Sequence, residues 1–287
     1  MLRVRRSVNR VMWLRGTSGS KKHGTRDAMS LPIKLISTDF DGTIFAEFEN
    51  PPIAENLQRI IGDLQSKGAK WVINTGREMA SLMESLGRAR ISIEPDHLVL
   101  VEREIHTREG VRYVGLHQWN SECTQAHEEL FARILPDLPR LTDWINSRFH
   151  ATVYEDPYSP FCLIAGSKSD ADVINQYLED YCRSVPDLTV VRNDVYSRFS
   201  HAAYNKGTAL AELMRRLKIK PQEVFAAGDH WNDLPMLSRE YAHWLATPAN
   251  GIDSVKSTVR DQKGFISALS HGYGVADALT KCLTNRF

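Results

Sequence analysis

Residues 33–43 read IKLISTDFDGT, an apolar stretch that ends in two acids and a glycine. The part up to Thr38 is short and rich in β-prone residues, which predicts a buried strand. The residues Asp39, Asp41 and Gly42 then predict a loop at the end of that strand. The chain therefore carries two carboxylates at the end of a buried strand.

The segments that follow alternate between helical and strand patterns. Residues 53–64 place apolar side chains on one helical face, and Gly68 ends that pattern. Residues 71–73 predict a second buried strand, which runs into a small polar turn at 74–76, and another helix begins near residue 78. The order strand, helix, strand, helix predicts an α/β fold with a Rossmann-like parallel sheet.

Residues from about 90 to 200 follow a different pattern. Strand-like runs at 98–101, 161–165, 188–192 and 197–203 alternate with helical ones, and some follow each other without a helix between them. Antiparallel pairs in an α+β unit explain that order, and the strand–helix alternation returns after Lys206. We therefore expect a basic N-terminal extension at 1–29, a core domain at 30–84 and 200–287, and an inserted α+β domain at 85–199.

The net charge of +1 hides an uneven distribution. Residues 1–29 hold eight Lys or Arg and one acid, which leaves 28 of the 36 bases and 34 of the 35 acids for the rest. An acidic body argues against a nucleic-acid-binding protein, which needs a basic face to meet phosphates. The basic segment has three interpretations: a disordered tail, an Arg-rich organelle-targeting segment, or sequence upstream of a misassigned start, with Met29 as the first residue.

Two further features bear on the class of protein. No apolar run approaches membrane-spanning length, which argues against a membrane-embedded protein. The four cysteines are scattered, with neither a CxxC pair nor a zinc-like Cys/His spacing. We interpret them as reduced thiols of a cytoplasmic protein.

The pair Asp39 and Asp41 carries the strongest chemical signal. In an extended segment residues i and i+2 point the same way, so the two carboxylates repel each other unless a cation lies between them. Mg²⁺ suits such a site because it prefers hard oxygen ligands. One carboxylate can then attack phosphorus, while the other exchanges protons with the leaving group and with water. The competing interpretation is a solvated turn or a calcium loop, although no bidentate acid stands at the distance after Asp39 that a calcium loop needs.

Other polar residues stand at the ends of other predicted elements. Thr75 offers a hydroxyl, and Lys206 precedes a helix, where it can neutralise charge on a transferring phosphoryl group. Asp229 and Asp233 flank a turn after the strand at 224–227 and can complete a magnesium shell. Taken singly, each also fits a turn residue, a surface lysine or a helix cap. In an open parallel sheet these strand ends meet at one edge, where ligands bind.

The joint order of these motifs resembles the haloacid dehalogenase-like hydrolase superfamily. The four motifs of that superfamily correspond to residues 39–43 (DFDGT), 74–77 (NTGR), 205–207 (NKG) and 228–233 (GDHWND). The long gap between the second and third motifs resembles the subfamily IIB arrangement of Cof-type and sucrose-phosphatase-like enzymes. That resemblance implies a catalytic core at 30–84 and 200–287 and a cap domain at 85–199. Two departures from that group are residues 101–104 (VERE), where many members have Asn-Gly-Ala, and 247–248 (TP).

The resemblance implies roles for individual residues. It implies Asp39 as nucleophile, Asp41 as acid and base, and Thr75 and Lys206 as the groups that hold the phosphoryl oxygens. It implies a magnesium ion held by Asp39, the backbone carbonyl of Asp41 and Asp229, with Asp233 in support. The residues expected around the phosphate are Gly42, Thr43, Gly76, Arg77 and Asn232.

The function expected on this basis is Mg²⁺-dependent hydrolysis of a phosphomonoester. The substrate is expected to be a small phosphorylated metabolite, such as a sugar phosphate, with no nucleic-acid or membrane partner. Arg192, Asn193, Arg198 and His201 of the cap either touch such a sugar or are exposed strand residues. The alternatives are a phosphotransferase or mutase on the same scaffold, and a non-catalytic sugar-phosphate-binding protein. We expect a monomer or a homodimer.

Overall fold

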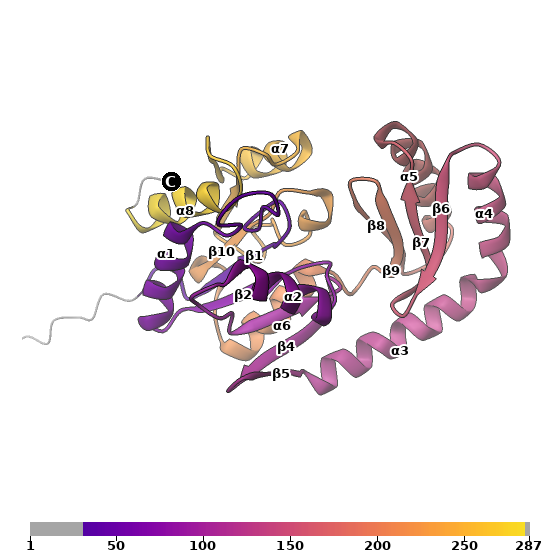
Figure 1. Cartoon of the computed structure of the whole chain (residues 1–287). Coiled ribbons are helices and arrows are strands. Elements are labelled where there is room, and N and C mark those ends of the chain that lie inside the picture. The colour runs from indigo at the N-terminus through magenta and orange to yellow at the C-terminus, as the bar shows by residue number, and fades with distance from the viewer. Residues whose placement is uncertain (1–30, 285–287) are drawn as a thin grey trace, which may run out of the picture. The chain divides into compact units, whose positions relative to one another are not determined.

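The structure is a computed structural model and describes residues 31–284. The basic extension predicted at 1–29 lies outside the described residues. Two sheets organise this part of the chain (Figure 1). The larger sheet has eight strands in the order β12-β11-β10-β1-β2-β3-β4-β5, and the smaller has four in the order β6-β7-β9-β8.

The larger sheet is parallel from β12 to β3, and β4 and β5 extend it in antiparallel pairs. Its strands are β1 (Leu35–Thr38), β2 (Lys70–Asn74), β3 (His97–Leu100), β4 (Glu104–Glu109), β5 (Arg112–Gly115), β10 (Val224–Ala227), β11 (Trp244–Thr247) and β12 (Phe265–Ile266). The helices that accompany it are α1 (Glu55–Ser66), α2 (Met79–Ala89), α6 (Lys206–Leu217), α7 (Asp253–Asp261) and α8 (His271–Leu283).

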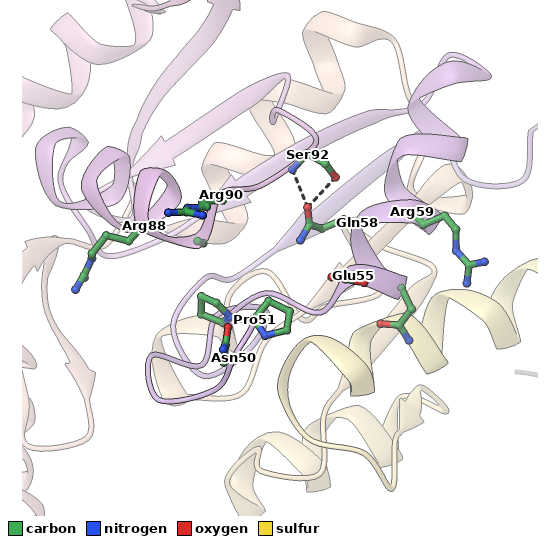
Figure 2. A pocket seen from close by; sticks show the side chains of 11 residues that line it. Asn50, Pro51, Glu55, Gln58, Arg59, Arg88, Arg90 and Ser92 are labelled. Atoms are coloured by element: carbon green, nitrogen blue, oxygen red, sulfur yellow. Dashed lines mark hydrogen bonds between the residues drawn. The ribbon is translucent and has the colours of Figure 1, made fainter.

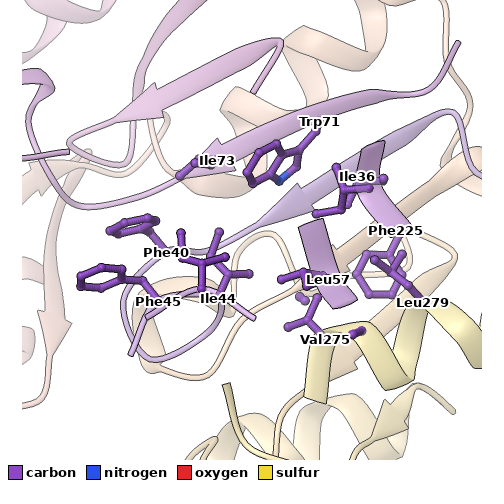
Figure 3. Close-up of a cluster of buried hydrophobic side chains, with 14 of the residues drawn as sticks. Ile36, Phe40, Ile44, Phe45, Leu57, Trp71, Ile73, Phe225, Val275 and Leu279 are labelled. Carbon is purple, nitrogen blue, oxygen red and sulfur yellow. The ribbon is translucent and has the colours of Figure 1, made fainter. Parts of the chain in front are cut away.

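Both faces of the larger sheet are covered, because successive residues of its strands feed two different cores. Ile36 of β1 and Phe225 of β10 pack with α1, α2 and α8, and this cluster is drawn in Figure 3. Leu35 and Val224, their neighbours along the chain, pack on the opposite face with α6 and α7. Burial on both faces explains why the central strands are continuous apolar runs.

The smaller sheet belongs to the insert and is antiparallel throughout. Its strands are β6 (Ala151–Asp156), β7 (Ser159–Ala165), β8 (Leu188–Asn193) and β9 (Tyr196–His201), and its helices are α3 (His117–Ile134), α4 (Leu138–Asn146) and α5 (Lys168–Cys182). Within residues 31–284, 3₁₀ turns are formed at Leu135–Asp137, Pro221–Glu223 and Trp231–Asp233. One face of this sheet packs on the helices around Phe161 and Phe199. The predicted fold class, a parallel-sheet core with an inserted α+β unit, is confirmed.

The insert differs from the predicted boundary at its start. We expected it to begin at residue 85, but β3 to β5 are strands of the larger sheet, and α2, which spans residue 85, packs against that sheet. β3 pairs in parallel with β2, and β4 then returns antiparallel along β3. A strand belongs to the sheet whose strands share backbone hydrogen bonds with it. The polar sequence of β4 does not indicate which strand it pairs with, so the boundary could not be predicted from it.

Candidate active site

The predicted reactive residues follow three adjacent strands of the larger sheet. Thr38 at the end of β1 pairs with Ala227 of β10 on one side and with Ile73 of β2 on the other. Asp39, Asp229 and Thr75 come one or two residues after these positions, so they meet at the same edge of the sheet.

Lys206 connects two of the acids. Its Nζ lies 2.6 Å from Oδ1 of Asp39 and 2.6 Å from Oδ1 of Asp233, and its side chain is fully buried. Burial opposes the positive charge, but Asp233 and Asp39 outweigh it, so the pKa of Lys206 is raised. The residue stays charged, and it neutralises only part of the acid cluster around it.

The chain fixes Lys206 from two directions. Asn205 caps helix α6: its side-chain oxygen accepts hydrogen bonds from the backbone N–H groups of Gly207 and Thr208. Asn74 at the end of β2 donates its side-chain N–H to the carbonyl of Lys206 at 2.9 Å. The lysine of the predicted third motif is thereby tied to the second motif.

Three carboxylates form a buried group that can hold a metal ion. Oxygens of Asp39, Asp229 and Asp233 all lie within 4.8 Å of one another. Burial, and after it the charge of Asp233, raises the pKa of Asp39 well above its usual value. The same two causes raise the pKa of Asp229 to about 7. Three hard oxygen ligands with one lysine between them leave an uncompensated negative charge, and a divalent cation fits that donor set.

The loop after β10 holds this group in place. Oδ2 of Asp233 accepts the backbone N–H groups of Asp229 at 2.8 Å and His230 at 2.9 Å. This closes a short 3₁₀ turn at residues 231–233, within the turn expected after the strand at 224–227. Thr43 donates its hydroxyl to Oδ1 of Asp229 at 2.7 Å.

Gly42 allows Asp229 to approach the loop after β1. The glycine has φ +75°, and a Cβ at this position would lie 2.4 Å from Oδ2 of Asp229. A side chain at this position would therefore push the carboxylate of Asp229 away. It would also be strained, because side chains disfavour that backbone conformation. The carbonyl of Gly42 also accepts from Nδ2 of Asn250 at 2.7 Å.

Asp41 takes a different position from the other acids. Arg77 donates to both of its carboxylate oxygens, from Nε at 2.7 Å and from a terminal nitrogen at 2.6 Å. The guanidinium of Arg77 also lies over the rings of Phe40 and Phe45. The side chain of Asp41 is thus outside the carboxylate group of Asp39, and Arg77, which we expected at the phosphate, is engaged with Asp41.

The remaining predicted residues lie around the same edge. Thr75 is buried, and its hydroxyl accepts the backbone N–H of Arg77 at 3.1 Å. Gly76 follows it in the same loop, and its α-carbon faces Glu102. Asn232 donates its side-chain N–H to Oε1 of Glu102 at 2.9 Å.

Residues of the insert reach this edge as well. Arg198 of β9 donates to the carbonyl of Val101 at 2.7 Å, and the guanidinium of Arg192 lies 4.2 Å from the ring centre of Trp231. His201 instead donates its backbone N–H to His127 of α3, within the insert. Sequence reasoning assigned no role to Glu102; the only signal was that residues 101–104 depart from the Asn-Gly-Ala pattern.

Two cavities lie near these elements, and only one touches predicted site residues. A cavity of about 490 Å³ is lined by Lys206, Asn232, Glu102 and Trp231, together with residues of α5 and β8. A larger hollow of about 900 Å³ lies beside α1 and the end of α2, as Figure 2 shows. The arginines that line this hollow are exposed, and the carboxamide oxygen of Gln58 already accepts hydrogen bonds from Ser92. The hollow is therefore separate from the acid cluster.

Known proteins with the same arrangement were found by sequence and by structure. A model of haloacid dehalogenase-like hydrolases matches residues 145–279. The 5-amino-6-(5-phospho-D-ribitylamino)uracil phosphatase YcsE of Bacillus subtilis is 23% identical over 265 residues, which are 86% of this chain and 94% of that protein. The chain is therefore similar to haloacid dehalogenase-like hydrolases. The expected resemblance to subfamily IIB is thereby confirmed, and so is the expectation of a phosphatase-type enzyme.

Solved structures share the fold of this hydrolase. The sucrose-phosphatase of Synechocystis sp. PCC6803, solved with sucrose and phosphate, has a TM-score of 0.66 at 18% identity and covers 88% of this chain and 98% of its own. A haloacid dehalogenase-like hydrolase from B. subtilis has a TM-score of 0.59 at 18% identity, with 86% and 99% covered. Within residues 31–284 of the hydrolase, no helix combines the length and the apolar character needed to cross a membrane.

Proposed function

We propose that the protein hydrolyses the phosphomonoester of a small metabolite, a sugar phosphate, through an aspartyl-phosphate on Asp39. The observation that carries this proposal is the environment of Asp39. Its carboxylate lies at the end of β1, bound to Lys206 and grouped with Asp229 and Asp233. A nucleophile needs an anchored position and nearby positive charge for the phosphoryl oxygens.

The buried acid group would hold a magnesium ion through Asp39, Asp229 and Asp233, with the backbone carbonyl of Asp41 as a further ligand. Such an ion, when bound, neutralises charge that spreads over the phosphoryl oxygens. The raised pKa of Asp39 and of Asp229 is consistent with this assignment, because both reflect burial first and then the charge of Asp233, which Lys206 does not fully balance.

Asp39 would act as nucleophile through the oxygen that Lys206 does not hold. Lys206 binds Oδ1, so Oδ2 attacks phosphorus as the bond to the leaving alcohol breaks. Thr75 and Lys206 would hold the phosphoryl oxygens. Water then attacks the aspartyl-phosphate, which releases phosphate and restores the carboxylate.

Asp41 would give a proton to the leaving oxygen and later accept one from water. A carboxylate that accepts two guanidinium hydrogen bonds has no proton to donate, so Asp41 must first part from Arg77. A substrate phosphate offers Arg77 another bidentate acceptor, which is consistent with the predicted phosphate-binding role of this arginine.

The named relatives support a phosphorylated polyol or sugar as substrate. The B. subtilis relative is named for a ribityl phosphate, and the Synechocystis enzyme was solved with sucrose and phosphate. The expectations of a cytoplasmic protein, of a monomer or homodimer, and of no nucleic-acid or membrane partner stay predictions.

The test compares wild-type protein with Asp39→Asn in a phosphate-release assay with p-nitrophenyl phosphate, with and without Mg²⁺. We expect release by the wild type with Mg²⁺ only, and a loss of at least about a thousandfold in Asp39→Asn. Asp143→Asn, at an exposed position of α4, is the matched control and should keep full activity. Turnover by folded Asp39→Asn close to that of the wild type would refute the nucleophile. Product analysis with a sugar phosphate separates hydrolysis from transfer to a second hydroxyl.

A further inference from the structure

We propose that Glu102 determines substrate specificity by accepting a hydrogen bond from a hydroxyl group of the leaving alcohol, which selects polyhydroxylated phosphate esters. The inference rests on the proposed phosphatase function and goes beyond it, because it names the residue that recognises the part of the substrate away from phosphorus.

The backbone around Glu102 has an unusual conformation. Val101 has φ +43° and Glu102 has φ +69°, both in the left-handed region that side chains disfavour, above all the β-branched valine. Hydrogen bonds hold the turn against the second motif: Val101 donates to the carbonyl of Arg77 at 3.0 Å, and Glu102 donates to that of Thr75 at 2.9 Å. Strain of this kind persists only where surrounding contacts enforce it, and it concentrates at functional sites.

This turn directs the carboxylate of Glu102 toward the edge of the sheet at which Asp39, Asp229 and Thr75 meet. The residue is 7% exposed, and its Oε1 accepts from Asn232 of the fourth motif. A Cβ on Gly76 would lie 3.2 Å from the same oxygen, so the carboxylate rests against the second motif as well. Oε2 lies 3.6 Å from a guanidinium nitrogen of Arg198, which comes from the insert.

The carboxylate also lines a cavity of substrate size. The 490 Å³ cavity is bounded by Glu102, Lys206 and Asn232 on the side of the core, and by α5 and β8 on the side of the insert. Two buried polar atoms beside Glu102 have no hydrogen-bond partner in the described part of the chain: Oδ1 of Asn232, an acceptor, and Nε of Arg198, a donor. Buried polar groups are normally satisfied, so unpaired ones point to a bound partner.

The charges beside Glu102 bear on the chemistry of that partner, while Asp172, Glu179 and Arg192 line the cavity on the side of the insert. A carboxylate on the leaving group would face Glu102 at close range. An ammonium group beside Glu102 would lie near two buried cations, Lys206, which lines the cavity, and Arg198, which pairs with Glu102. A hydroxyl group is neutral, donates one hydrogen bond and accepts others, so it suits Glu102 and Asn232 as acceptors and Arg198 as donor.

A purely structural role for Glu102, as counter-ion of Arg198, predicts a different result. Loss of the pair would then lower stability and affect all substrates equally. The experiment must therefore measure a ratio between substrates, which a general loss of activity or of folded protein leaves unchanged.

The experiment measures kcat/KM for three phosphate esters of equal chain length: a hexitol 6-phosphate, n-hexyl phosphate and 6-aminohexyl phosphate. It uses the full chain with Mg²⁺, as wild type, Glu102→Gln and Glu102→Leu. Glu128→Gln, at an exposed position of α3, is the control for loss of one carboxylate charge. We expect the wild type and the control to prefer the hexitol ester over the hexyl ester by roughly tenfold to a hundredfold. That ratio should shrink in Glu102→Gln and approach one in Glu102→Leu.

The outcomes separate this inference from the proposed function. If the wild type releases phosphate neither from the three esters nor from p-nitrophenyl phosphate, the proposed phosphatase function fails. If the wild type is active but shows no preference, or prefers the aminohexyl ester, the inference about Glu102 fails while the function stands. A preference that survives unchanged in folded Glu102→Leu also overturns the inference.

Discussion

Replacing Lys206 with methionine should destabilise the protein strongly, and more so at high pH. The lysine is the cation that lies 2.6 Å from both Asp39 and Asp233, with no exposure to solvent. Methionine keeps most of the volume and removes the charge. Breaking a buried ion pair by removing one partner costs about 3–5 kcal/mol, since the other charge is left uncompensated. For a chain of this size, that corresponds to a fall in Tm of about 6–20 °C.

The pH dependence follows from the acids that remain. Asp39 and Asp229 already have raised pKa values, so the folded state binds protons that the unfolded state has lost. Stability then falls as pH rises above the unfolded value of about 4, up to the folded values. Without Lys206 those folded values rise further, so the loss of stability should be larger at pH 8 than at pH 5. The charge of Lys206 itself does not change in this window, because its pKa is raised above its usual value.

The assay is thermal and denaturant unfolding of metal-free protein at pH 5 and pH 8. Lys168→Met is the matched control, because Lys168 makes an exposed ion pair with Asp194 at 2.9 Å, and it should change Tm little. The double variant Lys206→Met with Asp39→Asn removes one orphaned carboxylate, so it should be more stable than the sum of the two single effects implies. A loss that is equal at both pH values, or no larger than that of the control, would refute the reasoning.

Two further predictions concern the acid group. Mg²⁺ should raise Tm more at pH 8 than at pH 5, because the pKa of Asp229 is raised to about 7 by burial and by Asp233, and protons compete with the ion below that value. Equal shifts at both pH values would contradict this, and calorimetry in buffers of different ionisation enthalpy should detect the released protons. Thr43→Val should cost about 1–3 kcal/mol at pH 8 and less at pH 5, because the hydroxyl donates to the ionised form of Asp229. Denaturant unfolding at the two pH values measures this loss of stability, with Thr124→Val on the exposed face of α3 as control. A loss that does not depend on pH would contradict the prediction.

The sequence allowed the central strands and their polar ends to be predicted, because those signals are local. An apolar run that ends in DFDG, NTG or GD marks both the strand and its terminal loop, and parallel order brings such ends together. The convergence of Asp39, Lys206, Asp229 and Asp233 follows from that rule. Their chemical roles stay predictions.

Other features depend on contacts that no local pattern encodes. Arg77 stands 36 residues from Asp41, and nothing in either motif indicates that they pair. Glu102 reaches the site only because Val101 adopts a left-handed conformation, which a valine does not signal. The strands β4 and β5 joined the larger sheet, where we expected the insert to have begun, because strand pairing is a property of the neighbour as well as of the strand.

The acid group and its lysine all come from the larger sheet and helix α6, and none comes from residues 117–201. Under the proposed function, substitutions in the insert would alter which molecules are accepted without changing the charges of the acid group. Substrate preference and the chemistry of the acid group could then change independently in evolution. The same scaffold could acquire new substrates through substitutions in the insert alone. That independence is limited by contacts such as those of Arg198 with Val101 and Glu102 and of Arg192 with Trp231, so paired changes at these positions are a place to begin when redesigning selectivity.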